Sequence, residues 1–395
     1  MTTPGVRDLA VAVYLPSMVY SIGRGAIMPV VALSARELGA SVGVAGTVVA
    51  LLGVGQICGD IPAGALTGRL GERNAMLLAS GVAVIALAVC LVAPSVWVLM
   101  VGILGVGLAQ AIWMLARQAY VTEVVPLRLR GRALATLGGV QRIGLFFGPF
   151  VGAGVMHFAG TDGAYWVQLG AAVTAGSLLF MAADVARTRR AAAATVGGMS
   201  PLTVIRDHAS VLRTLGVAAL LFGAVRASRQ VVIPLWAEHL GLSPTATSLV
   251  FGIAGALDMV MFYPAGKVMD RFGRWWVAMP SMLVLGVAHL LLPFTHSVPT
   301  LLAASLLMGA GNGIGSGLIM TLGSDVSPPT GRAEFLGIWR LTADTGTAIG
   351  PVIISGITVI AALAPAILAM GAIAVVAVLP FRRWIPRNPY GRAGA

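Results

Sequence analysis

Charged residues are scarce in this chain, and the scarcity excludes most soluble proteins. Of its 395 residues, 58% are hydrophobic and only 10% are Asp, Glu, Lys or Arg. A soluble chain of this length needs far more charge to cover its surface. Three long stretches, 74–116, 275–324 and 345–381, contain no Asp, Glu, Lys or Arg at all. Because a bilayer span needs about 20 apolar residues, each stretch can hold two membrane-spanning helices.

Cysteines and the residue patterns of enzymes are also rare or missing. The two cysteines, Cys58 and Cys90, lie in apolar segments and are expected to pack as small core residues without a disulfide. The sequence has no nucleotide-binding loop, no metal-ligand cluster and no nucleophile–base combination. We therefore expect no enzyme, no metal site and no cofactor, and ATP-driven transport by this chain alone is excluded.

The charges that are present lie mostly between apolar segments and predict a membrane topology. The net charge of +12 forms no basic stripe with aromatic residues, so nucleic-acid binding is not expected. Arginine and lysine gather in alternate loops, whereas the opposite loops hold only Arg36. The positive-inside rule then places both termini in the cytoplasm. The twelve predicted spans are 9–34, 43–67, 75–93, 96–122, 133–158, 163–185, 212–236, 244–266, 275–294, 298–324, 333–359 and 362–381.

The two halves of the chain match at a constant shift of 202 residues, as from Arg24 to Arg226. The shift also pairs Gln110 with Asn312, Glu123 with Asp325, and several glycines and prolines. Two six-helix copies have the same orientation and should be related by an axis along the membrane normal, with a cavity between them. The predicted fold is therefore all-α, with 12 transmembrane helices in two pseudo-twofold-related bundles. We expect an N-terminal bundle at 1–186, a cytoplasmic linker at 187–210 and a C-terminal bundle at 211–395.

Three motifs carry a resemblance to a known family. Residues 64–73 read GALTGRLGER, residues 266–274 read GKVMDRFGR, and 144–152 follow the pattern GxxxGPxxG. Together they resemble the major facilitator superfamily and, within it, the 12-helix drug:proton antiporters, over nearly the whole chain. The chain departs from the pattern at Gly68, where the motif has an acid. An arginine expected near Ile103, which relatives use in proton coupling, is also missing.

The first two motifs predict a conformational latch, meaning ion pairs that hold one conformation and break in the other. Gly64 and Gly266 are expected to let their helices approach a neighbour closely, and the arginines that follow can pair with Glu123 or Asp325. The alternative interpretation is a basic loop that only sets the topology. The predicted latch residues are Gly64, Arg69, Gly71, Arg73, Glu123, Asp270, Arg271, Gly273 and Asp325.

The third motif places three glycines on one face of a helix. Gly144, Gly148 and Gly152 stack at i, i+4 and i+8 as a flat packing surface. Pro149 removes one backbone hydrogen bond and is expected to bend the helix. The pattern itself predicts close helix packing, and the resemblance implies that the helix belongs to an antiporter.

Nine charged residues are predicted at membrane depth, where each costs roughly 2.5–3.5 kcal/mol and therefore indicates a function. They are Arg24, Asp60, Arg117, Arg142, Arg226, Arg229, Asp258, Arg340 and Asp344. Burial disfavours the charged form of a carboxylate, so the three aspartates are the predicted proton carriers. The alternative for each aspartate is permanent pairing with an arginine, which for Asp344 means Arg340 at i−4 or Arg142 of the other half.

Six arginines and three aspartates give these groups a net charge of +3, which favours an anionic or zwitterionic substrate. Arg24 and Arg226 are placed as a two-sided anion clamp would need. Aromatic residues of membrane helices more often pack than bind, but three lie beside the charged positions. The predicted substrate-binding residues are Tyr20, Arg24, Gln110, Trp113, Arg117, Arg142, Arg226, Arg229, Trp339 and Arg340.

Two functions follow from these patterns. The first is a proton-coupled exporter, an antiporter of small amphipathic organic compounds that works by alternating access. The second is a transporter of organic anions or acidic lipids, as exchanger or symporter. The expected partners are a small-molecule substrate, protons and the lipid bilayer. We expect a monomer in a bacterial cytoplasmic membrane.

Overall fold

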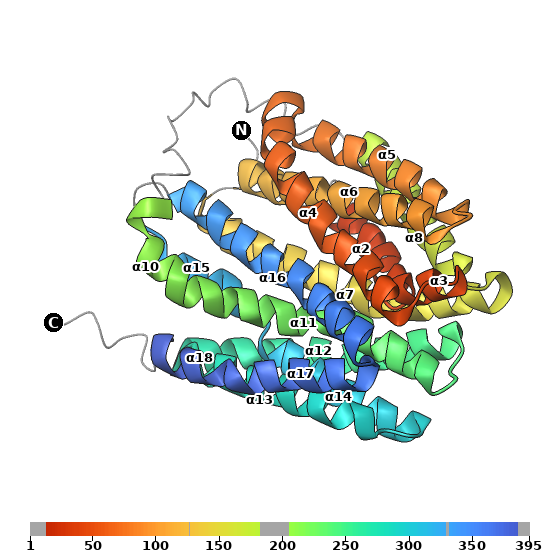
Figure 1. Ribbon diagram of the computed structural model, residues 1–395. Coiled ribbons are helices and arrows are strands. Elements are labelled where there is room, and N and C mark those ends of the chain that lie inside the picture. Colours follow the sequence, from red (N-terminus) through yellow and green to blue (C-terminus); the bar gives the residue numbers. More distant parts are fainter. Residues whose placement is uncertain (1–12, 126, 182–204, 329–331, 386–395) are drawn as a thin grey trace. The chain divides into compact units, whose positions relative to one another are not determined.

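The computed structural model describes residues 13–125, 127–181, 205–328 and 332–385, and all regular secondary structure within these ranges is helical (Figure 1). The predicted linker lies largely outside the described residues. The helices of the first half are α2 (Leu15–Ile27), α3 (Val31–Glu37), α4 (Val42–Leu70), α5 (Glu72–Leu91), α6 (Val96–Val124), α7 (Leu127–Ala159) and α8 (Asp162–Met181). Those of the second half are α10 (Ala209–Val211), α11 (Val217–His239), α12 (Pro244–Phe272), α13 (Trp275–Leu291), α14 (Val298–Ile314), α15 (Leu318–Val326), α16 (Arg332–Ile360), α17 (Leu363–Val376) and α18 (Val378–Trp384).

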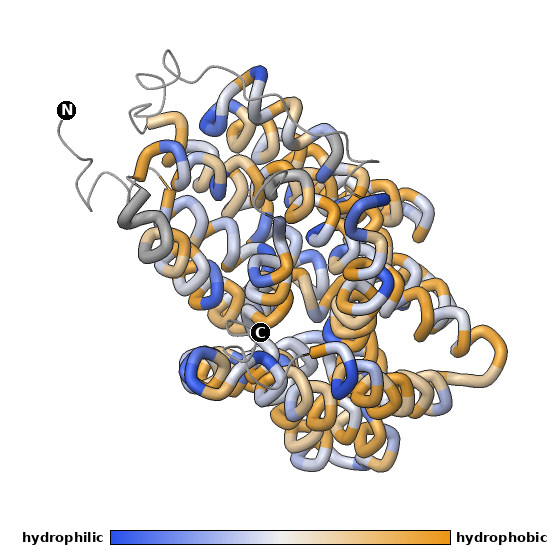
Figure 2. Tube along the Cα trace, turned by 90° about the vertical axis from the view of Figure 1, so that its left-hand side faces the viewer, coloured by the Kyte–Doolittle hydropathy of each residue, from blue (hydrophilic) through white to orange (hydrophobic). Residues whose placement is uncertain are grey.

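The described helices confirm the predicted membrane-spanning pattern. Eleven segments are long and apolar enough to cross a bilayer, and a twelfth span forms if α2 and α3, which meet at an angle of 41°, are taken together. Figure 2 shows apolar residues along most of the helical segments and hydrophilic residues at many of their ends. The helical backbone satisfies its own hydrogen bonds, as a lipid environment requires.

The chain forms two compact units. Unit 1 comprises residues 1–41, 51–195 and 243–252, and unit 2 comprises 42–50, 196–242 and 253–395. The two exchanged segments are the starts of α4 and α12, which correspond to each other under the 202-residue shift. Domain boundaries at 186 and 211 stay a prediction.

The internal repeat reappears in the packing of each unit. At Gly148 of α7, an added Cβ would overlap the backbone around Ile22 of α2. At Gly350 of α16, it would overlap the carbonyl group of Ala224 of α11, and both residues of this contact follow from the first by the same shift. The glycines therefore allow two membrane helices to approach at backbone distance, which is how helices without a hydrophobic driving force associate.

The loop glycines of the first two motifs have a conformational role. Gly71 ends α4 with a φ of +87°, and Gly273 ends α12 with a φ of +100°. This region of φ is strained for residues that carry a Cβ atom. The two positions are related by the 202-residue shift, so the same sharp junction between consecutive helices occurs in both units.

Candidate functional site

A cluster of three polar side chains lies in the interior of unit 1. The side-chain oxygen of Gln110 on α6 faces the guanidinium group of Arg24 on α2, at 2.7 Å from Nε, 2.7 Å from Nη2 and 3.0 Å from Nη1. Gln56 of α4 donates to the same oxygen at 2.7 Å. These donors fix the orientation of the Gln110 amide, since only its oxygen can accept them.

Aromatic side chains extend this cluster along α2 and α6. The rings of Tyr20 and Trp113 stack with centroids 4.7 Å apart and an angle of 20° between their planes. Both side chains are almost fully buried, and Trp113 donates from its indole to the hydroxyl of Ser80 on α5 at 2.9 Å. The hydroxyl of Tyr20 is buried and has no hydrogen-bond partner among the described residues. Such an unsatisfied group next to an arginine is a natural contact point for a ligand.

Further charged residues of unit 1 lie on α4, α6 and α7. Arg117 is buried and donates from Nη2 to Oε1 of Gln141 at 2.5 Å. Arg142, the next residue on α7, is half-buried. Asp60 of α4 is also half-buried, and both of its carboxylate oxygens are shielded from solvent. Three arginines and one aspartate give this part of unit 1 a positive balance.

A continuous hydrogen-bonded chain of four side chains lies in unit 2. Arg226 of α11 donates from Nε to Oδ1 of Asn312 on α14 at 2.6 Å. Asn312 donates from Nδ2 to Oδ2 of Asp258 on α12 at 2.5 Å. Arg229 of α11 donates to the same carboxylate oxygen at 3.3 Å. The side chains of Arg229 and Asp258 are only 11% and 15% exposed, so this ion pair is largely desolvated.

The two clusters occupy corresponding positions under the 202-residue shift. In unit 1, Arg24 of α2 contacts the amide of Gln110 on α6, which contacts Gln56 on α4. In unit 2, Arg226 of α11 contacts the amide of Asn312 on α14, which contacts Asp258 on α12. The acceptor on α12 is Asp258, whereas its counterpart on α4 is Gln56. Asp258 contacts Arg229 directly and Arg226 only through Asn312. Removal of one partner of a buried ion pair costs about 3–5 kcal/mol. The α12 position carries a carboxylate where the corresponding α4 position carries an amide.

The remaining charged pair at membrane depth is local. Arg340 and Asp344 of α16 lie 3.4 Å apart between Nε and Oδ2, at i and i+4 of one helix. This agrees with the alternative interpretation of a helix-internal pair, which is a weak interaction when partly exposed. Trp339, predicted to line the substrate site, is buried and donates to the backbone carbonyl of Ile319 at 2.8 Å. In this conformation its ring packs against α15.

At the helix ends, one predicted latch acid is found in an ion pair. Asp325 of α15 accepts two hydrogen bonds from Arg274, at 2.7 Å from Nε and 3.0 Å from Nη2. The bidentate geometry makes this a stronger pair than most exposed ones. The sequence interpretation selected Arg271 instead, but its guanidinium lies over the ring of Phe272 at 5.2 Å. Arg274 was missed because spacing alone does not choose between two arginines of one loop.

The other latch positions differ from the expectation in detail. Arg73 donates to the backbone carbonyls of Leu179 and Phe180, at 2.8 and 2.6 Å, and so caps the end of α8. A Cβ added at Gly64 or Gly266 would meet no atom within 4 Å, so the expected close helix approach is not found there. Arg69, Asp270 and Arg271 are exposed. A latch through these residues stays a proposal about another conformation.

The glycine face of the third motif lies against α2, as the stacking pattern predicts. A Cβ added at Gly144 would come within 2.6 Å of the backbone oxygen of Met18, and one at Gly152 within 3.0 Å of Ala26. The helix α7 continues through Pro149 without ending. The motif therefore holds α2, which carries Tyr20 and Arg24, in place.

Four polar residues of these sites were not among the predicted site residues. They are Gln56, Ser80, Gln141 and Asn312. The repeat was a signal for two of them, because Asn312 corresponds to Gln110 and Gln56 to Asp258. Ser80 and Gln141 carry no such signal. No three His, Cys, Asp or Glu side chains gather as metal ligands anywhere in the described ranges.

Comparisons with known proteins show which family the chain resembles. A family model described as Major Facilitator Superfamily matches residues 13–226 and 215–394. The chain is 28% identical over 126 residues to an arabinose-proton symporter of Bacillus subtilis, a match covering 32% of this chain and only 27% of that protein. It is 22% identical over 292 residues to the multidrug resistance protein MdtH of Yersinia pestis, covering 73% and 71% of the two chains.

Among solved structures, the human organic anion transporter MFSD10 (TETRAN) superposes with a TM-score of 0.68 at 18% identity. The superposition covers 96% of this chain and all of the other. At this level of identity the similarity shows the fold alone.

Proposed function

The chain belongs to the Major Facilitator Superfamily, a family of membrane transporters, and we propose that it is a proton-coupled exporter of small amphipathic organic compounds. Export would proceed by alternating access between the two units. The resemblance of the third motif to drug:proton antiporters supports export, as does the similarity to MdtH. We place the protein, as a monomer, in a bacterial cytoplasmic membrane with both termini in the cytoplasm.

The observation that carries this proposal is the environment of Asp258. Its carboxylate accepts hydrogen bonds from Asn312 and Arg229 while largely shielded from water. An acid at this depth is costly and therefore rarely retained without a role in transport. A donor group of the substrate and a proton would compete for the same carboxylate. Competition of this kind is what exchange of substrate against proton requires.

The unit 2 cluster also supplies a route from the proton to the substrate site. Asn312 bridges Asp258 to Arg226 with its two amide atoms. A proton on Asp258 removes the negative charge that attracts Arg229 and makes the carboxyl group a weaker acceptor for Asn312. Arg229 then loses its ionic partner, Asn312 is held less strongly, and the cluster rearranges. This makes Asn312 the positioning residue between proton binding and Arg226.

A second function, transport of organic anions or acidic lipids, is favoured by a different observation. Arg24 and Arg226 are each bound by an amide oxygen, which a carboxylate or phosphate can displace because charge-assisted hydrogen bonds are stronger. In this case an anion bound to Arg226 would displace Asn312, weaken the hydrogen bond from Asn312 to Asp258 and leave the acid ready to accept a proton. Substrate and proton would then bind together, as in symport.

The sign of the proton change on binding separates the two functions. We expect that purified protein in weakly buffered detergent solution, containing a pH-sensitive dye, releases protons when an amphipathic cationic or zwitterionic compound binds. Asp258→Asn should abolish the release, whereas Asp207→Asn, which changes an exposed carboxylate, should leave it intact. Proton uptake when anionic compounds bind, together with loss of that uptake in Arg226→Gln, would contradict the exporter proposal and support the anion-transporter proposal.

A further inference from the structure

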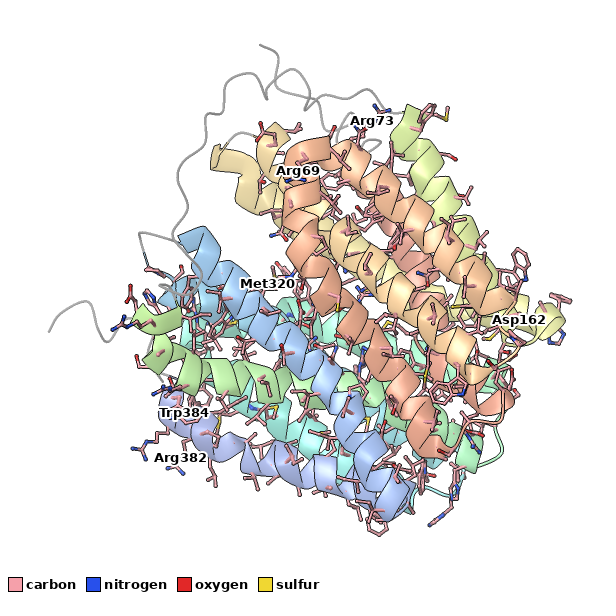
Figure 3. The ribbon with its side chains drawn as sticks, turned by 45° about the horizontal axis from the view of Figure 1, so that its top comes forward. Arg69, Arg73, Asp162, Met320, Arg382 and Trp384 are labelled. Atoms are coloured by element: carbon pink, nitrogen blue, oxygen red, sulfur yellow. The ribbon has the colours of Figure 1, made fainter. Side chains whose placement is uncertain are left out.

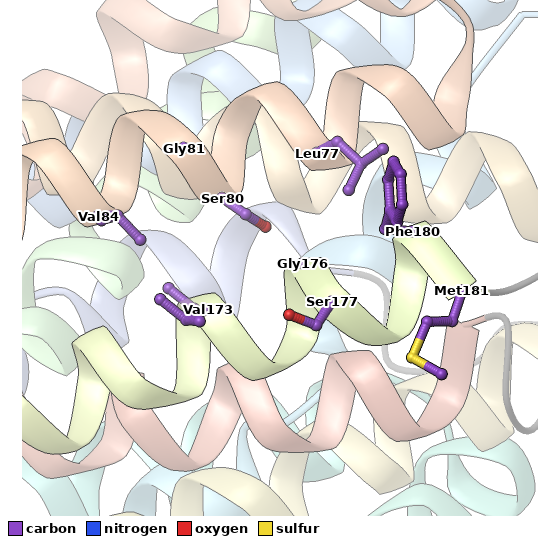
Figure 4. Close-up of a pocket in the computed structure, with 10 residues that line it drawn as sticks. Leu77, Ser80, Gly81, Val84, Val173, Gly176, Ser177, Phe180 and Met181 are labelled. Atoms are coloured by element: carbon purple, nitrogen blue, oxygen red, sulfur yellow. The ribbon is translucent and has the colours of Figure 1, made fainter.

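A groove lies on unit 1 between α5 and α8. It has a volume of about 510 Å³, and its walls are formed by Leu77, Val84, Val173 and Phe180 (Figure 4). Gly81 and Gly176, which also line the groove, carry no side chain to cover the helix backbone. From Leu77 to Val84 it follows α5 for about 10 Å, given a rise of 1.5 Å per residue. Its walls are apolar and outward-facing, and both helices are membrane spans. The groove therefore opens into the hydrocarbon layer.

One end of the groove carries positive charge. Arg73 is fixed there by its hydrogen bonds to the carbonyls of Leu179 and Phe180, the last turn of α8. Arg69 is exposed at the end of α4, next to the start of α5 (Figure 3). Glu72 lies between them in the sequence, so the three side chains have a net charge of +1. Arginines at this depth attract anionic lipid headgroups.

From the helix ends inward, the groove presents charged, hydroxyl and apolar groups in the same order as the headgroup, ester groups and acyl chains of a phospholipid. Ser177 lies one helical turn before the end of α8, and its exposed hydroxyl is directed into the groove (Figure 4). This places a hydroxyl about 6 Å inside the helix end, just below the arginines, where the ester groups of a lipid lie. Deeper in the groove the lining is apolar apart from Ser80, whose buried hydroxyl accepts a hydrogen bond from Trp113. We propose that this groove binds an anionic phospholipid, with its headgroup at Arg69 and Arg73 and one acyl chain between α5 and α8.

A lipid in the groove would also contact the interior cluster of unit 1. Ser80, on the groove wall, accepts the hydrogen bond of Trp113, and Trp113 stacks on Tyr20. The acyl chain would therefore cover the serine that orients Trp113. The lipid acts here as a structural ligand of unit 1 and does not depend on which substrate is transported.

The test is to count bound lipids by native mass spectrometry. Purified protein is mixed with phosphatidylglycerol or phosphatidylcholine of equal chain length. We expect tight retention of phosphatidylglycerol by the wild type and weaker retention of phosphatidylcholine. Gly81→Leu should weaken retention of phosphatidylglycerol by about tenfold or more, because each methylene excluded from an apolar site changes affinity by roughly fourfold.

Gly81→Leu fills the groove without a clash, since an added Cβ meets no atom within 4 Å. The matched control is Gly170→Leu, at an equally open position of α8 outside the groove lining. Ser177→Phe fills the groove from the other wall and serves if Gly81→Leu does not fold. Equal retention by wild type and both groove-filling variants would overturn the site. Equal retention of the two lipids, or no effect of Arg69→Gln, would overturn the assignment of an anionic headgroup.

Discussion

Arg24 and Arg226 hold the same position in two copies of one helix, but the residues that complete their clusters on α4 and α12 differ. Arg24 is bound to Gln110 and, through it, to Gln56, whereas Arg226 is connected through Asn312 to a carboxylate. The duplicated sequence predicted which residues correspond. It did not predict that the amides would bind the arginines directly, because that depends on the rotation of each helix and on side-chain rotamers. At the residue scale, this difference is why the proposed proton-binding role is assigned to Asp258.

Tyr20 provides a test of the substrate site at this scale. Its buried hydroxyl has no hydrogen-bond partner among the described residues, and the corresponding residue of the second half is Phe222. We expect Tyr20→Phe to leave thermal stability unchanged or slightly raised, since no hydrogen bond is lost. If the hydroxyl binds substrate, the same change should weaken substrate binding by about 5–10-fold, the effect of one hydrogen bond. Unchanged affinity would remove Tyr20 from the site.

At the scale of the helices, hydropathy predicted most spans to within a few residues. The predicted segment 96–122 is found as Val96–Val124, and 43–67 as Val42–Leu70. Two breaks were not predicted. The span expected at 298–324 is divided into α14 and α15 after Ile314, and the first span bends between α2 and α3. Such breaks depend on local glycine and proline geometry, and they leave the average hydropathy of the segment unchanged.

The glycine contacts between α2 and α7 give a prediction at the same scale. Gly148→Leu would force a side chain into the backbone of α2, and overpacking of this kind costs about 1–3 kcal/mol or more. We expect a clear fall in the thermal unfolding temperature in detergent. Gly350→Leu, the counterpart in unit 2, should behave in the same way.

The matched controls lie on the same two helices. Gly154→Leu on α7 and Gly356→Leu on α16 add the same side chain where no atom lies within 4 Å. They should unfold close to the wild-type temperature. If all four variants unfold at the same temperature, helix packing by the third motif is not what stabilises the units.

At the scale of the whole molecule, the 202-residue shift relates contacts as well as sequence. Glycine contacts, left-handed junctions and arginine–amide clusters all recur at corresponding positions of the two units. The sequence therefore predicted the duplicated architecture and the family. The substrate could not be predicted in the same way, since it depends on the few positions where the copies differ, such as Gln56 and Asp258. Those differences are also where proton coupling is proposed.

The most direct test of the proposed coupling is substrate transport in proteoliposomes under an imposed pH gradient. With a lumen more acidic than the outside, an exchanger should accumulate an amphipathic compound in the lumen, and an uncoupler should abolish the accumulation. Asp258→Asn should retain equilibration of the compound without accumulation against its gradient. Accumulation that is unchanged when the pH gradient is collapsed, or unchanged in Asp258→Asn, would contradict the account.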